Sequence, residues 1–131
     1  MHLLQTYLVE DSPVIRENLV ATLEELAPVH VVGTAEDESS AVQWLACHEV
    51  DLVIVDLFLK GGSGLGVLRA VQAWPAGARH VVLSNYATEE MRARCLALGA
   101  DGVFDKSTEI DALIAYCNQL AAQHEFSVPP R

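Results

Sequence analysis

The chain has 131 residues, 51% of them hydrophobic, and a formal net charge of −10 at pH 7. This length and apolar content suffice for one domain with its own core. The negative charge argues against direct nucleic-acid binding and against binding to anionic membrane surfaces, because both depend on Lys and Arg.

Short apolar runs alternate along the chain with segments of helical period. The first run is LLQTYLV (3–9), and the others predict strands at 29–35, 51–56, 80–84 and 102–104. Between the runs, apolar residues recur every three or four positions, as expected of helices that bury one face. This order predicts an α/β fold: a doubly wound, five-stranded parallel sheet with right-handed crossovers.

Capping residues mark the expected ends of several helices. A Ser or Thr precedes three helical segments, at Ser12, Ser40 and Thr88, and Gly99 stands where a helix should end. The segment HEFSVPPR breaks the helical pattern and ends in Pro-Pro. We therefore expect a domain over residues 1–123 and a flexible C-terminal tail over 124–131.

Cysteine usage and hydropathy indicate a cytoplasmic protein. The three cysteines are far apart and lie among apolar residues, which predicts buried thiols in a reducing compartment. No apolar run approaches the ~20 residues that a membrane span requires. The five histidines show no spacing typical of metal ligands.

Polar side chains follow four of the predicted strands. Glu10 and Asp11 end the first strand, Asp56 the third and Ser84 the fourth, and Lys106 follows the fifth. The carboxyl ends of parallel strands lie at one edge of a sheet, where α/β proteins bind their ligands. We expect these five side chains to lie in one crevice.

The chemistry of this set favours formation of an aspartyl phosphate. Three carboxylates repel one another unless a cation lies among them, and Mg²⁺ suits oxygen ligands of this kind. Lys106 and Ser84 could hold an oxyanion beside Asp56. A carboxylate can then attack phosphorus while the metal ion and the lysine neutralise the charge that develops.

The glycines after Asp56 do not predict a nucleotide site. Gly61 and Gly66 match half of a P-loop, but Val67 and Leu68 follow where that motif requires Lys and Ser or Thr. The better interpretation is mechanical, because glycines allow a tight turn between Asp56 and the next helix. The loop then displays the acid.

At this point the sequence resembles the receiver domain of bacterial two-component response regulators, over about residues 4–122. The stretches that carry the resemblance are LVED with the following SPVIR, DLVIVDLFLKGGSGLGVL, HVVLSNYATEE and GADGVFDKS. The resemblance implies a flavodoxin-like fold with strand order 2-1-3-4-5. It also implies a phosphorylation-dependent switch that works through protein contacts, without catalysis on an external substrate.

The resemblance assigns a role to each site residue. It makes Asp56 the phosphoacceptor, with Ser84 contacting the phosphoryl group and Lys106 as its counter-ion. The Mg²⁺ ligands would be Glu10, Asp11, Asp56 and the backbone carbonyl of Phe58. The implied donor is a sensor histidine kinase or a histidine phosphotransfer protein. The downstream protein partner, and whether the phosphorylated form dimerises, stay open.

Four positions depart from the family pattern. Glu10 stands where Asp is more common, which lengthens one arm of the metal site. Asn85 stands where Ala or Gly is usual, and Ser107 follows Lys106 where a proline with a cis bond is typical. A cis bond before Ser costs about 3 kcal/mol, so a trans bond is expected. Val103 replaces the aromatic residue that commonly turns inward on activation, and Phe104 should point to the opposite face.

Several alternatives stay open. The departures motivate a receiver-like adaptor without a phospho-switch. A phosphatase or phosphomutase would need a second acid where Phe58 stands, and a flavin carrier would need a phosphate loop in place of Glu10 and Asp11. No output segment follows residue 123, so the chain is expected to be a single-domain regulator or a fragment.

Exposed positions on the predicted helices suggest contact surfaces. Val14, Asn18 and Ala21 share a face that resembles the one receivers offer to a kinase. Arg92 and Arg94 are candidates for an output surface or simply solvated charges. Trp44 and Trp74 are expected to pack partly against the sheet.

Overall fold

The computed structural model describes residues 3–72, 77–85 and 87–127, in which strands and helices alternate. The strands are β1 (Leu4–Val9), β2 (Val29–Ala35), β3 (Leu52–Val55), β4 (Arg79–Ser84) and β5 (Gly102–Asp105). The helices are α1 (Pro13–Leu26), α2 (Glu38–Cys47), α3 (Gly64–Gln72), α4 (Glu89–Ala97) and α5 (Ile110–Ser127). Each predicted strand is present, within one residue of its expected bounds.

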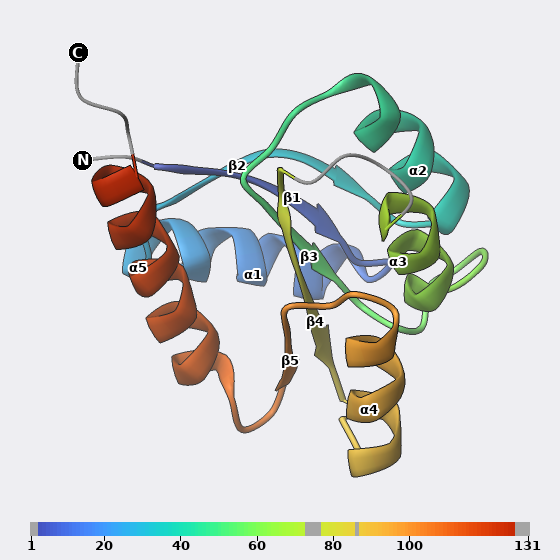
Figure 1. Cartoon of the computed structure of the whole chain (residues 1–131). Helices are drawn as coiled ribbons and strands as arrows, with labels where there is room; N and C mark the ends of the chain where they lie inside the picture. The colour runs from blue at the N-terminus through green and yellow to red at the C-terminus, as the bar shows by residue number, and fades with distance from the viewer. Residues whose placement is uncertain (1–2, 73–76, 86, 128–131) are drawn as a thin grey trace.

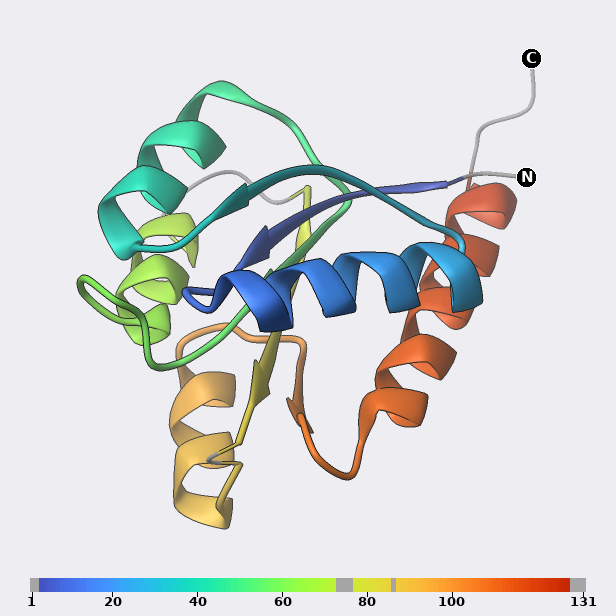
Figure 2. The same cartoon turned by 180° about the vertical axis from the view of Figure 1, so that it is seen from behind.

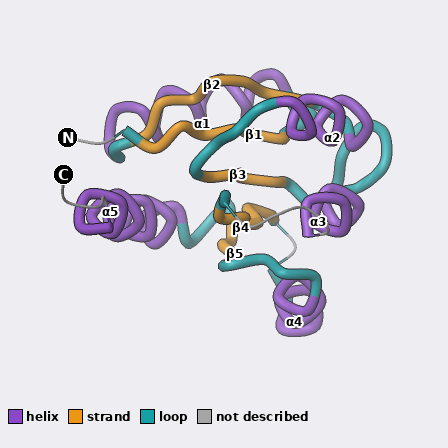
Figure 3. Tube along the Cα trace, turned by 45° about the horizontal axis from the view of Figure 1, so that its top comes forward, coloured by secondary structure: helices purple, strands orange, loops and turns teal. Residues whose placement is uncertain are grey.

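The strands form one parallel sheet in the order β2-β1-β3-β4-β5 (Figure 1). Helices α1 and α5 cover one face of the sheet, as Figure 2 shows from behind. Helices α2, α3 and α4 cover the other face (Figure 3). The doubly wound fold and the strand order are therefore confirmed.

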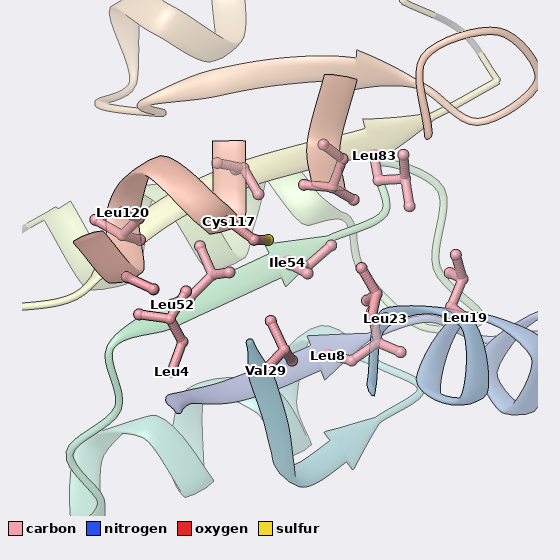
Figure 4. Packing of buried hydrophobic residues seen from close by; sticks show 13 residues of the cluster. Leu4, Leu8, Leu19, Leu23, Val29, Leu52, Ile54, Leu83, Cys117 and Leu120 are labelled. Atoms are coloured by element: carbon pink, nitrogen blue, oxygen red, sulfur yellow. The ribbon is translucent and has the colours of Figure 1, made fainter. Parts of the chain in front are cut away.

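Alternate residues of the strands pack on opposite faces of the sheet, into one cluster beside α1 and α5 and two clusters beside α2, α3 and α4. In β3, Leu52 and Ile54 pack toward α1 and α5, in the cluster that Figure 4 shows. Val53 and Val55 pack toward α2 and α3, and all four side chains are fully buried. Covering on both faces explains why this strand is an unbroken apolar run.

The helix starts follow local hydrogen bonds. The Ser12 and Thr88 side chains accept bonds from the N–H groups of Ile15 and Met91, as predicted for N-caps. The prediction for Ser40 is wrong, because α2 begins three residues earlier than a cap at that position implies. Asp37 caps this helix, and its Oδ1 accepts a bond of 2.7 Å from the N–H of Ser40. The carboxylate forms a charge-assisted bond, which is stronger than the bond to a hydroxyl.

The end of α4 agrees with the prediction, and the end of α5 differs from it. Gly99 follows α4 with a φ of +95°, which suits a glycine at this position. Helix α5 continues to Ser127, four residues beyond the boundary expected after residue 123. Residues 124–127 contain neither Gly nor Pro, so nothing in them breaks the helix. The rest of the predicted tail, residues 128–131, lies outside the described residues, as does Trp74.

The cysteines differ from one another in burial. All three are free thiols; Cys95 and Cys117 are buried, as predicted, whereas Cys47 is exposed at the end of α2. None of the helices in the described part of the chain is long and apolar enough to cross a bilayer.

Trp44 packs against the sheet, as predicted. Its ring stacks on Tyr7 of β1 with centroids 4.2 Å apart, and on His48 with centroids 3.9 Å apart. Gly33 of β2 lies beneath this stack, and a Cβ there would lie 3.0 Å from Cε1 of Tyr7. A glycine therefore makes room for the aromatic stack on the edge of the sheet.

Candidate functional site

The predicted site residues gather at the carboxyl edge of the sheet. β1 and β3 pair in register, so Glu10 and Asp56 follow neighbouring positions, and the N–H of Asp56 donates to the carbonyl of Val9. On the other side, Ser84 pairs with Asp105, and the N–H of Lys106 donates to the carbonyl of Ser84. β3 and β4 also pair in parallel, so the register of three strand pairs brings residues from four strand ends together.

Three carboxylates form a cluster that could hold a metal ion. Glu10, Asp11 and Asp56 each offer one oxygen, and these oxygens lie within 4.8 Å of one another. Glu10 and Asp56 are buried, and Asp11 is partly exposed. Burial and the adjacent carboxylate of Glu10 raise the pKa of Asp11, as expected where like charges are crowded.

Lys106 lies between two of these acids. Its Nζ is 2.9 Å from Oδ2 of Asp56 and also donates to Oε1 of Glu10. Burial favours the neutral amine, but the hydrogen bonds to Glu10 and Asp56 outweigh it and raise the pKa of Lys106. The ammonium group therefore stays charged beside Asp56.

Glu10 is held from three sides. While Lys106 occupies Oε1, the N–H of Ser12 donates to Oε2 at 3.2 Å. The guanidinium of Arg16 donates to the backbone carbonyl of Glu10 at 3.1 Å. Sequence reasoning missed Arg16, although it lies in the stretch SPVIR; its position one turn into α1 directs it back to the acidic loop.

Ser84 and Phe58 lie where the sequence placed them. Ser84 ends β4 with its side chain fully buried. Phe58 lies two residues after Asp56, and its backbone pairs with Ser63 across the turn. The Phe58 side chain is 54% exposed, so only its backbone belongs to the framework of the site.

The glycine-rich loop is a turn that displays Asp56, as predicted. Gly62 has a φ of +79°, a conformation that favours glycine. A Cβ on Gly64 would lie 2.2 Å from the carbonyl oxygen of Asp56. The chain can therefore start α3 directly against the acid only with a glycine at this position.

The structure shows how the residues that depart from the family pattern are packed. Val103 packs in the cluster under α4, whereas Phe104 lies against Tyr116 of α5, on the opposite face, as predicted. The described residues contain no cis peptide bond, so the bond before Ser107 is trans, as expected. Asn85 is exposed.

A cavity of about 290 Å³ opens next to Lys106. Its lining includes Ile15 and Asn18 of α1 and Asn85 after β4. Val14, Asn18 and Ala21 are all exposed, so the predicted contact face of α1 is free of packing within the described chain. The cavity and this face adjoin.

Arg92 is a structural residue, which sequence reasoning did not identify. Its guanidinium donates to the carbonyls of Ala87 and Val103 and to the carboxylate of Glu109. Glu109 in turn accepts a bond from the N–H of Asp105, and the bond from Arg92 contributes most to lowering the pKa of Glu109. These bonds join α4 to the loop that carries Lys106.

We expect Arg92→Ala to destabilise the protein by about 1–3 kcal/mol, because the partly buried backbone carbonyls of Ala87 and Val103 lose a charged donor. Urea unfolding followed by circular dichroism would measure this change. Arg94→Ala is the matched control, since Arg94 is exposed, and should change the free energy by less than ~0.5 kcal/mol. Equal stabilities for the two variants would show that the bonds of Arg92 contribute nothing.

Comparisons with a family model and with curated proteins identify the same family for this chain. The family model "Response regulator receiver domain" matches residues 6–118. The response regulator UvrY of Escherichia coli is 27% identical over 104 residues, which cover 79% of this chain and 48% of UvrY. A protein-glutamate methylesterase/protein-glutamine glutaminase of Myxococcus xanthus is 33% identical over 82% of this chain and 31% of its own length. The chain therefore spans about half or less of these curated relatives.

Solved structures agree with this fold. The receiver domain of the response regulator NarL from Mycobacterium tuberculosis superimposes with a TM-score of 0.80 at 26% identity, covering 91% of this chain and 98% of that domain. The BeF3-activated receiver domain of RstA from Klebsiella pneumoniae gives a TM-score of 0.75 at 25% identity, covering 86% and 93%.

Proposed function

Since the chain belongs to the family of response regulator receiver domains, we propose that Asp56 accepts a phosphoryl group and that the protein signals through contacts that depend on it. The observation that carries this proposal is the position of Lys106, whose Nζ lies 2.9 Å from Oδ2 of Asp56 beside two further acids. The donor would be a phosphohistidine on a sensor histidine kinase or a histidine phosphotransfer protein.

The transfer uses groups that the chain supplies. An oxygen of Asp56 attacks phosphorus, and the bond between phosphorus and the donor imidazole nitrogen breaks. The imidazole leaves with the electron pair of that bond and takes a proton from solvent. Lys106 neutralises charge on the phosphoryl oxygens, and the hydroxyl of Ser84 donates to one of them.

The acidic cluster fits a divalent cation. Among the residues that the structure describes, Lys106 is the one cation that forms ion pairs with its carboxylates, and oxygen ligands suit Mg²⁺. We propose that Glu10, Asp11, Asp56 and the carbonyl of Phe58 hold Mg²⁺, which when bound would neutralise phosphoryl charge.

The partners of the proposed switch are proteins. The exposed face of α1 adjoins the cavity beside Lys106, and Lys106 contacts Asp56, so a donor domain bound to this face would lie next to the acceptor. The chain would work in the cytoplasm, where its thiols stay reduced. It would not act as an enzyme on an external ester, because Phe58 gives no general acid after the nucleophile.

A receiver-like adaptor without a switch is the second candidate. The observation that favours it is the packing of Val103, which gives the α4 side of β5 no aromatic side chain to turn inward. This candidate predicts partner binding that is the same for the wild type and for Asp56→Asn.

The intact mass of the protein after incubation with acetyl phosphate tests the proposed function. We expect the mass to increase by one phosphoryl group when Mg²⁺ is present and to stay unchanged when EDTA replaces it, because Mg²⁺ offsets charge in an acidic site. A mass increase of the same size in EDTA would contradict the assignment of the Mg²⁺ ligands. No mass increase under either condition would favour the receiver-like adaptor.

A further inference from the structure

The loop after Asp56 is held by the first residue of α2. The N–H of Glu38 donates to the carbonyl of Gly61 at 2.9 Å. The N–H of Ser63 donates to Oε1 of Glu38 at 3.0 Å. We call these two hydrogen bonds the Glu38 clamp; they fasten the loop at both ends of its glycine pair to a helix that lies beside α3 (Figure 3).

Two glycines make the space that the Glu38 side chain fills. A Cβ on Gly62 would lie 2.5 Å from Cβ and from Oε1 of Glu38. A Cβ on Gly66 would lie 2.2 Å from Oε1 and 2.4 Å from Oε2. A side chain at position 66 would displace the carboxylate, and one at position 62 would collide with Cβ of Glu38 as well. In this chain, the glycine-rich segment therefore accommodates an anion that the protein itself supplies.

A carboxylate suits this place electrostatically. Glu38 lies in the first turn of α2, and its Oε1 binds the N–H of Ser63, which directly precedes α3. Negative charge is favourable near the N-terminus of a helix. One side chain thus stabilises the start of two helices and fixes the loop between β3 and α3.

The clamp reaches the acidic site through the backbone. Ser63, which Glu38 holds, pairs with Phe58, and the N–H of Gly64 donates to the carbonyl of Leu57 at 2.9 Å. Leu57 and Phe58 directly follow Asp56. The position of this backbone is therefore set from α2, a helix that contributes no side chain to the acidic cluster.

We propose that Glu38 is a positioning residue that sets the affinity of the site for Mg²⁺, by fixing the backbone of residues 57–63. The proposal rests on the proposed function, because it takes the carbonyl of Phe58 and the three acids as the ligands. Glu38 acts through the loop and does not touch the ion. Groups that orient metal ligands commonly change metal affinity by about 10–100-fold when removed.

The first test is a Mg²⁺ titration of the ¹⁵N-labelled full chain, followed by NMR. We expect Glu38→Ala to weaken Mg²⁺ binding about tenfold, and Glu38→Gln to retain most of the affinity because its amide keeps an acceptor oxygen. The amide hydrogen of Ser63 should exchange faster in Glu38→Ala even without Mg²⁺. This exchange reads out the clamp independently of the metal.

Glu36→Ala is the matched control. It removes the same charge from a neighbouring residue, whose carboxylate lies 3.8 Å from Nζ of the exposed Lys60 in the same loop. Exposed ion pairs contribute little, so Mg²⁺ affinity should stay at the wild-type value. Equal weakening by Glu36→Ala and Glu38→Ala would reduce the effect to net charge and overturn the proposal.

A second test uses Gly66 and needs no metal. In the wild type, Gly66→Ala should speed exchange at Ser63, because the new methyl group displaces the Glu38 carboxylate. The loss of the bond to Ser63 should also offset at least part of the stability that an alanine in a helix adds. In a Glu38→Ala background the same change should raise the midpoint, since Ala is a better helix former than Gly. Midpoint shifts of equal size in both backgrounds would show no coupling between positions 38 and 66 and would overturn the clamp.

The two proposals fail in different ways. A wild-type protein that neither binds Mg²⁺ nor gains a phosphoryl group would refute the proposed function. The amide exchange of Ser63 and the effect of Gly66→Ala would then still test the hydrogen bonds of the Glu38 clamp. A wild type that binds Mg²⁺ with the same affinity as Glu38→Ala would refute the positioning role alone.

Discussion

Asp56→Asn is expected to reduce phosphorylation by acetyl phosphate and Mg²⁺ below detection. The Asn side chain has nearly the size of the carboxylate, but its neutral amide is a far weaker nucleophile, so no bond to phosphorus forms. Intact-mass spectrometry of the variant, with the wild type treated in parallel, measures the loss directly.

The fold should survive this substitution, which makes the result interpretable. The amide oxygen of Asn can still accept the bond from Lys106, and the change removes one of three clustered negative charges. We expect the unfolding temperature of Asp56→Asn to equal or exceed that of the wild type. If the variant still gained a phosphoryl group, Asp56 would not be the acceptor, and Glu10 and Asp11 would be the first positions to map by peptide fragmentation.

Lys106→Met is expected to slow phosphorylation about 100-fold, because the transferring group loses a preorganised cation. It should also destabilise the protein without Mg²⁺ by about 3 kcal/mol, since the buried carboxylate of Glu10 loses its charged partner. The measurements are the rate of mass increase with acetyl phosphate and urea unfolding with and without Mg²⁺. Added Mg²⁺ should restore part of the stability, because it binds the folded state.

Lys60→Met is the matched control for this prediction. Lys60 carries the same charge, but its side chain is 72% exposed and its nearest carboxylate lies 3.8 Å away. Both the rate and the stability of Lys60→Met should stay close to the wild-type values. A Lys106→Met protein that is phosphorylated at the wild-type rate would remove the lysine from the proposed chemistry.

The elements that the sequence predicted well are those decided by local pattern. Leu52–Val55 is an unbroken apolar run followed directly by an acid, and the same run is a strand buried on both faces that ends at Asp56. The strand order came from the family resemblance, because periodicity does not say which strands are neighbours. The gathering of Glu10, Asp56 and Lys106 followed from the rule that parallel strands end at one edge.

The features that the sequence did not predict depend on contacts between distant residues. The bond from Ser63 to Glu38 crosses 25 positions, and the bond from Arg92 to Glu109 crosses 17. No periodic pattern encodes such pairs. The cap of α2 was misplaced for a more local reason, since Ser40 and Asp37 are both good caps and the charged one prevails. The roles of the acids toward Mg²⁺ stay predictions.

The packing of Glu38 against Gly62 and Gly66 constrains the order in which this sequence can change over evolutionary time. While the acid is present, a side chain at position 62 or 66 collides with it. Once position 38 has lost the acid, Gly66, which lies in a helix, can accept a side chain at little cost. Positions 38 and 66 should therefore vary together among descendants of this chain, with the change at 38 preceding a change at 66. Gly62 stays constrained by its φ of +79° whatever residue occupies position 38.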